Sequence, residues 1–208
     1  MGMVYFLDND VILKLTTYRM LDQALDCLEI DRYDIRVLAS ARFVFASKKL
    51  QKKYSGETLL SAVEFVKSCT TISAQDNDEY RLLEKQAKND IDPGEATLIA
   101  ATFHESASLL GTGDKRCLQA LASIESLALI HEKLQGRVIC LEQIICKLIE
   151  AQGFDWVLER VLPNLDCDKA LKSAFGSGSN SQSGTVLGTL NGYIQDLRTT
   201  SSGILSDL

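Results

Sequence analysis

Two acidic residues, Asp8 and Asp114, occupy matching places in the sequence, and a third, Glu95, lies between them. Asp8 ends the apolar run 3–7 and Asp114 follows the run 108–111, and helical periodicity resumes after each. In folds of alternating strands and helices, functional groups gather beyond the carboxyl ends of the strands. Carboxylates on such an edge suit Mg²⁺ or Mn²⁺, which also relieves their mutual repulsion. The pattern predicts a divalent metal site formed by Asp8, Glu95 and Asp114.

The same acids also have a purely structural interpretation, as helix caps. Asp92-Pro93-Gly94-Glu95 has the form of a capping box, in which Asp92 is the N-cap and Glu95 follows three residues later. Asp8 and Asp114 can each cap the helix that follows. Metal binding and capping therefore remain open for all three acids.

Apolar runs that alternate with helical periodicity indicate an α/β fold in which helices cover a parallel sheet. Strands are predicted at residues 3–7, 34–39, 69–73, 108–111 and 137–141. Helices are predicted at residues 11–28, 40–54, 57–67 and 76–88, from residue 92, after residue 114 and up to residue 152. One domain is expected over residues 1–172. Residues 173–208 are expected to form a Gly/Ser-rich linker and a flexible or partner-docking tail, because residues 176–184 have linker composition.

The composition is that of a globular protein, with 46% apolar and 24% charged residues among 208. Residues 1–7 carry no basic segment typical of a signal peptide, so a cytoplasmic location is expected. The six cysteines form no C-x-x-C pair, which favours buried thiols over zinc ligands or disulfides. A net charge of -6 argues against a protein that coats nucleic acid with its whole surface, but it permits a local basic patch.

Three segments of the chain resemble the motifs of PIN domains, a family of metal-dependent ribonucleases that includes toxins of toxin–antitoxin pairs. The segments are YFLDNDVIL, DPGEATLIAA and LLGTGDKRCL, and the resemblance spans roughly residues 3–150. It implies a three-layer αβα sandwich around a parallel sheet of four to five strands. It also implies that Asp8, Glu95 and Asp114 are catalytic metal ligands for Mg²⁺ or Mn²⁺, with Asp10 beside them. Family members commonly dimerise, so a homodimer and an antitoxin partner are further expectations.

The chain departs from the PIN pattern in one respect. The family usually carries a further acid after the second strand, and residues 35–56 contain no Asp or Glu. Either Asp10, Asp92 or Glu57 replaces that acid, or the site is weakened.

Basic residues supply candidate contacts to RNA phosphates. Lys115 and Arg116 adjoin Asp114, and Lys48, Lys49 and Lys52 fall on one face of a predicted helix. Solvation alone also explains that lysine face.

Two other functions remain open. Asp8 and Asp10 after an apolar strand also resemble the nucleophile motif of haloacid-dehalogenase-type phosphatases, in which the first acid attacks phosphate and the second transfers a proton. The third possibility is a PIN-like scaffold that has lost its activity and binds RNA, or binds a protein through its C-terminal tail.

Overall fold

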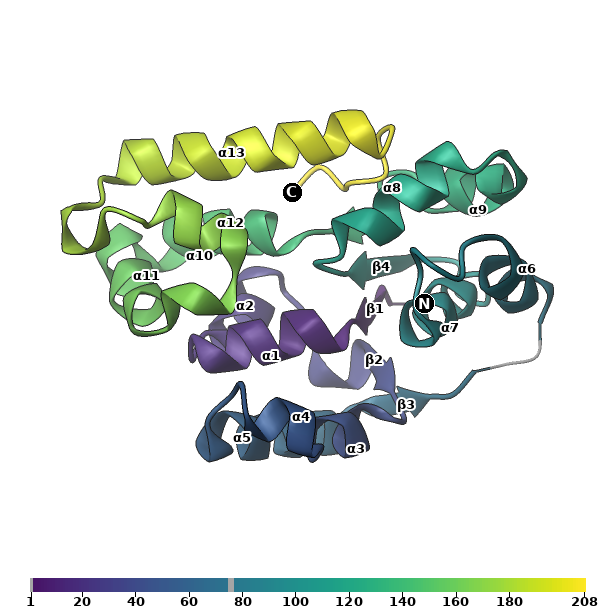
Figure 1. The fold of residues 1–208 in the computed structure, drawn as a ribbon, viewed down its shortest axis with the longest axis horizontal. Helices are drawn as coiled ribbons and strands as arrows, with labels where there is room; N and C mark the ends of the chain where they lie inside the picture. The colour runs from purple at the N-terminus through teal and green to yellow at the C-terminus, as the bar shows by residue number, and fades with distance from the viewer. Residues whose placement is uncertain (1, 75–76) are drawn as a thin grey trace.

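Five parallel strands form the centre of the computed structural model, which describes residues 2–74 and 77–208. The strands are β1 (Val4–Leu7), β2 (Ile35–Leu38), β3 (Thr70–Ile72), β4 (Ser108–Gly111) and β5 (Val138–Ile139). Their order across the sheet is β3-β2-β1-β4-β5, and each neighbouring pair is parallel. Helices flank the sheet, consistent with a three-layer sandwich (Figure 1). The predicted α/β fold with a parallel sheet is therefore confirmed.

The strand order reverses its direction between β1 and β4. From β1 the chain adds β2 and β3 on one side, and then returns to add β4 and β5 on the other. Val4 to Leu7 align with Ser108 to Gly111, so the two strands end level with each other. Such a reversal leaves a crevice beyond the carboxyl ends of the two central strands, where α/β proteins usually place their ligands.

The helices that follow the first four strands and precede the last one agree largely with the predicted ranges. They are α1 (Asn9–Thr17), α2 (Leu21–Cys27), α3 (Ala41–Phe45), α4 (Lys48–Gln51), α5 (Gly56–Ser68), α6 (Asp78–Gln86), α7 (Pro93–Thr102), α8 (Lys115–Ser123) and α9 (Ala128–Lys133). Residue 76, where the fourth helix was expected to begin, lies outside the described residues. Two predicted helices are each divided, 11–28 into α1 and α2 and 40–54 into α3 and α4. The first division occurs at Arg19, whose φ of 54° is left-handed and cannot continue a helix.

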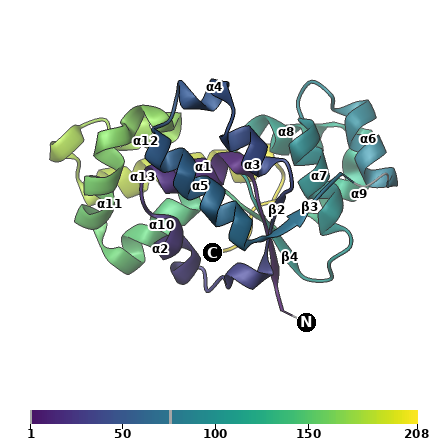
Figure 2. The same ribbon diagram turned by 90° about the horizontal axis from the view of Figure 1, so that it is seen from below.

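The C-terminal third of the chain packs on the rest of the protein. After α10 (Leu141–Gln152) come α11 (Phe154–Val161), the 3-10 helix η3 (Leu162–Cys167), α12 (Lys169–Ala174), the 3-10 helix η4 (Gly178–Asn180) and α13 (Ser183–Thr200). Figures 1 and 2 both show α11 and α12 at the end of the molecule opposite to α6 and α9. α13 contacts α10 and α12.

The expectation of a flexible or partner-docking tail at residues 173–208 therefore differs from the structure. Val186, Leu190, Ile194 and Leu197 lie on one face of α13, at spacings of four, four and three, and all are buried in the common core. Beyond α13, Leu205 pairs in parallel with Val138 of β5, and Ser206 N donates a hydrogen bond to Val138 O. The tail thus docks on its own domain and extends the sheet at β5.

All six cysteines are free thiols, and Cys117 and Cys140 are buried. No helix in the described part of the chain combines the length and the apolar character that crossing a bilayer demands.

Candidate functional site

Asp8 lies where β1 ends, at the reversal of the strand order. Its backbone N–H donates to Gly111 O of β4 at 2.9 Å, and its Oδ1 accepts from Asn9 N at 2.7 Å as the N-cap of α1. Burial and the neighbouring Asp10 charge raise the pKa of Asp8 to about 7, and Asp92 adds to the effect. Asp8 is therefore both a cap and a carboxylate that loses its proton only near neutral pH.

Glu95 belongs to the capping box that the sequence predicts. Asp92 N donates to Glu95 Oε2 and Glu95 N donates to Asp92 Oδ1, both at 2.8 Å. The Glu95 side chain is buried, and burial raises its pKa to about 8 against the lowering effect of the Asp92 N–H. The charges of Asp114, Asp92 and Asp8 raise it further. Glu95 is a cap and, at the same time, a neighbour of the other acids.

Asp114 caps α8 beyond the end of β4. Its Oδ1 accepts from Arg116 N at 2.8 Å and from Cys117 N at 3.2 Å, while its Oδ2 lies 3.2 Å from the Arg116 guanidinium. The buried Cys117 thiol has a raised pKa, first because of burial and then because of Glu95, Asp114, Asp8 and Asp92. All four carboxylates thus act on one buried group, so we call Asp8, Asp92, Glu95 and Asp114 the acidic cluster.

The acidic cluster is not a ready-made coordination sphere. Across residues 2–74 and 77–208, no group of three or more His, Cys, Asp or Glu side chains is arranged to hold a metal ion. Asp8, Glu95 and Asp114 each use one carboxylate oxygen to cap a helix. Their hard oxygen donors and their mutual repulsion nevertheless suit Mg²⁺ or Mn²⁺. Binding would require a side chain such as Asp114 to exchange its present partner, Arg116, for the cation.

Asp10, the fourth predicted ligand, faces a different partner. Its Oδ2 lies 2.5 Å from Lys14 Nζ, and Lys14 also contacts Asp168 Oδ2 at 2.7 Å. A Cβ on Gly113 would lie only 2.9 Å from Asp10 Oδ2, so a larger residue there would displace the Asp10 carboxylate from its present position. Asp10 therefore links the acidic cluster to a neighbouring network of paired charges. In the phosphatase interpretation Asp10 transfers a proton, and it would do so while paired with Lys14.

Lys14 is the centre of that network. Burial acts to lower its pKa, but Asp10 and Asp168 outweigh this effect and hold the pKa above its ordinary value. Burial likewise acts to raise the pKa of Asp168, but Lys14 together with the backbone N–H groups of Leu171 and Ala170 outweighs it, so that pKa lies below its ordinary value. The i, i+4 spacing of Asp10 and Lys14 could have indicated their pairing, whereas Asp168 lies too far along the chain for any local signal.

The predicted phosphate contacts are spread over different surroundings. Lys115 Nζ lies 3.0 Å from Glu142 Oε1 and 4.5 Å from the centre of the Tyr193 ring, so two C-terminal helices hold it. Arg116 is paired with Asp114. Lys48, Lys49 and Lys52 are exposed in and just after α4.

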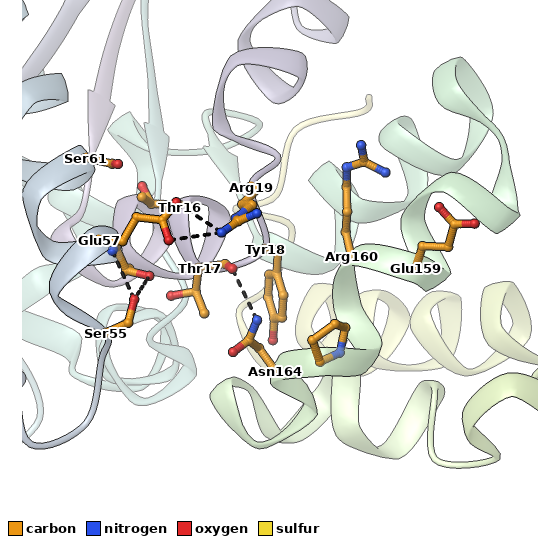
Figure 3. A pocket seen from close by; sticks show the side chains of 12 residues that line it. Thr16, Thr17, Tyr18, Arg19, Ser55, Glu57, Ser61, Glu159, Arg160 and Asn164 are labelled. Carbon is orange, nitrogen blue, oxygen red and sulfur yellow. Dashed lines mark hydrogen bonds and ion pairs between the residues drawn. The ribbon is translucent and has the colours of Figure 1, made fainter.

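Of the acids offered as replacements for the missing one, Asp92 joins the cluster. Glu57 instead contacts Arg19 through both of its oxygens at 3.0 Å, on the cavity drawn in Figure 3. The sequence signal for Asp92 was its place in the capping box.

Comparison of the chain with protein-family models, with curated proteins and with solved structures gives no match. The PIN resemblance therefore rests on the three sequence segments.

Proposed function

We propose that the chain is a divalent-metal-dependent ribonuclease of PIN type, with Asp8, Glu95 and Asp114 as the acids that bind Mg²⁺ or Mn²⁺. The observation that carries the proposal is the position of these acids. Asp8 and Asp114 lie beyond the adjacent carboxyl ends of β1 and β4, and the charges of both act on Glu95. Burial first, and repulsion from neighbouring carboxylates second, raise the pKa of Asp8 to about 7 and that of Glu95 to about 8. A divalent cation is the species that removes this repulsion.

The residues of the chain have two tasks in this proposal. Asp8 and Glu95 exchange protons for a cation near neutral pH, because their carboxyl groups are partly protonated there. Asp92 adds the negative charge that the family usually draws from the segment after the second strand. When bound, the cation supplies an activated water and stabilises charge on the phosphate.

We propose the PIN assignment and a toxin role from the sequence resemblance. The order of the three segments supports the PIN assignment, as do the positions of Asp8 and Asp114 after neighbouring strands of the sheet. An antitoxin partner and a homodimer belong to the same proposal.

The proposal is tested by incubating the protein with labelled single-stranded RNA and Mn²⁺, and in parallel with EDTA. We expect cleavage with Mn²⁺ only, and a loss of at least about 100-fold in Asp8→Asn and Asp114→Asn, because each substitution removes a charged ligand. Asp196→Asn, on the exposed side of α13, is the control and should cleave as the wild type does. Cleavage that persists in both site variants, or that survives EDTA, would refute the proposal.

A binding scaffold without activity is the second candidate, and the Asp114–Arg116 ion pair favours it. A guanidinium at that carboxylate supplies the positive charge that a metal ion would otherwise bring. The scaffold predicts RNA binding without cleavage at any Mn²⁺ concentration. It also predicts that Asp114→Asn leaves RNA binding unchanged.

A further inference from the structure

Three adjoining cavities form a groove. Two of them lie between the N-terminal helices and residues 159–167, and the remaining one also takes lining residues from α8, α10 and α13. The first, of about 400 Å³, is lined by Asp10, Gly113, Lys14, Lys53, Lys115 and Lys169 among others, and so begins beside the acidic cluster. It shares Lys53 and Cys167 with a second cavity of about 520 Å³. The second shares Thr17, Ser55 and Asn164 with a third, of about 630 Å³.

The near end of the groove carries more positive than negative charge, in a chain whose net charge is -6. Four lysines (14, 53, 115 and 169) face three carboxylates (Asp10, Glu142 and Asp168), which leaves an excess of one positive charge. Lys14 and Lys115 hold those carboxylates in ion pairs. Lys53 and Lys169 are exposed, and neither forms an ion pair with a carboxylate in residues 2–74 and 77–208. Two ammonium groups are therefore available to an anionic ligand.

The far end of the groove is polar, and Figure 3 shows it. Its walls are joined by a hydrogen bond of 3.4 Å from Asn164 Nδ2 to Thr17 O. Arg19 and Arg160 line this end together with Glu57 and Glu159, so its charges balance. The Arg160 guanidinium lies 3.7 Å from the centre of the Trp156 ring. Hydroxyls of Thr17, Ser55 and Thr58 lie between the two arginines and the lysine end.

We infer that this groove binds a single strand of RNA that leads away from the acidic cluster, with backbone phosphates at Lys53 and Lys169. The inference rests on the proposed ribonuclease function and names the surface that receives its substrate. Ammonium groups bind phosphates without regard to sequence, and hydroxyls and amides contact the sugar–phosphate backbone. Each cavity has a volume typical of a pocket for a small ligand, which is the scale of one or a few nucleotides. Helices line the groove on both sides, which favours an unpaired strand over a duplex.

The inference places the strand on a surface that the sequence did not indicate. One wall of the groove comes from α11, η3 and α12, which lie beyond the region that resembles PIN domains. Lys48, Lys49 and Lys52 of the expected basic face do not line any of the three cavities. Lys53 lines the groove whereas its neighbour Lys52 does not, so variants of these two lysines distinguish the groove from the expected basic face.

The test is fluorescence anisotropy with a labelled ten-nucleotide oligouridylate and the full chain in EDTA, so that cleavage does not interfere. We expect the double variant Lys53→Ala/Lys169→Ala to bind about tenfold more weakly, with a salt dependence lower by roughly two charges. The matched double variant Lys52→Ala/Lys67→Ala removes two exposed lysines that line none of the three cavities, and it should stay within about twofold of the wild type, as should Lys48→Ala/Lys49→Ala. All of these lysines are exposed, and thermal melting checks that each variant remains folded.

Three results would overturn the inference. They are equal losses in the groove variant and its matched control, a loss confined to Lys48→Ala/Lys49→Ala, and a wild type that binds duplex RNA as tightly as the single strand or binds neither. Binding that depends on Lys53 and Lys169 in a protein that never cleaves RNA would refute the ribonuclease and leave the groove assignment intact. Metal-dependent cleavage with an unchanged KM in the groove variant would refute the groove alone.

Discussion

The acidic cluster and the Lys14 network adjoin at Gly113, which precedes Asp114 and lies against Asp10 and Lys14, and they shift the pKa values of aspartates in opposite directions. In the cluster, burial first and neighbouring carboxylates second raise the pKa of Asp8 to about 7 and that of Glu95 to about 8. In the network, Lys14 lies between Asp10 and Asp168, and the pKa of Asp168 falls below its ordinary value. Burial opposes ionisation in both places, so the presence of an ammonium group makes the difference.

The comparison indicates which region maintains the fold and which is available for a ligand. A buried carboxylate with a built-in partner is satisfied and has little affinity left for a cation. Buried carboxylates that lack one cost stability when ionised, and that cost is recovered when a cation binds. The capping bonds keep the cluster acids in place despite their repulsion.

Removal of the network's ammonium group should have the largest effect. Lys14→Met leaves Asp10 and Asp168 without their shared partner, and Asp168 is mostly buried, so we expect a loss of about 3–5 kcal/mol in the free energy of unfolding, measured with urea at pH 7. Lys172→Met removes an exposed ion pair with Asp166 and should cost at most about 1 kcal/mol. Similar losses in the two variants would show that the Lys14 network is no different from a surface pair.

The cluster should make the protein less stable as pH rises. The pKa of Asp8 is higher in the folded chain, about 7, than its ordinary value of 3.8, so the folded state holds the proton more tightly between these values. Stability from this group is therefore lost as pH rises toward 7.

Asp8→Asn keeps a capping side chain but cannot ionise. In metal-free urea titrations, we expect the free energy of unfolding of this variant to rise by about 2 kcal/mol relative to that of the wild type between pH 5 and pH 8. Asp196→Asn, an exposed acid on α13, should show no such trend. A difference between Asp8→Asn and the wild type that stays constant with pH would mean that Asp8 ionises at its ordinary pKa in the folded chain.

The smallest effect on stability is expected at Arg116, whose side chain is mostly exposed. Arg116→Ala should leave the melting temperature almost unchanged, because exposed pairs contribute little. It should tighten Mn²⁺ binding about threefold, since it frees the second oxygen of Asp114. Weaker Mn²⁺ binding in Arg116→Ala would indicate that the guanidinium organises the site rather than competing for it.

The parts of the fold that local signals determine could be predicted from the sequence. The strand ends at Asp8 and before Asp114 follow from short apolar runs, and the start of α7 follows from Asp92-Pro93-Gly94-Glu95. α13 could not be predicted, because Gly188, Gly192 and the Gly/Ser-rich stretch before it lower helix propensity. The segment is helical because its apolar face packs on α10 and α12.

The site was predictable to a similar extent. The strand ends predicted Asp8 and Asp114, and the capping box contained both Glu95 and Asp92. The partners of Lys14 and Lys115 could not be anticipated, because Asp168, Glu142 and Tyr193 approach from helices remote in sequence. The groove depends on the same C-terminal helices, so it too was hidden from local patterns.

The central claim is that the acidic cluster exchanges protons for a divalent cation. Isothermal titration calorimetry of Mn²⁺, at pH 6 and pH 8 and in two buffers of different ionisation enthalpy, measures this directly. We expect binding at least about tenfold tighter at pH 8, with at least about one proton released at pH 6 and weak binding in Asp8→Asn. Binding of equal strength at both pH values without proton release, or no binding at either, would contradict it.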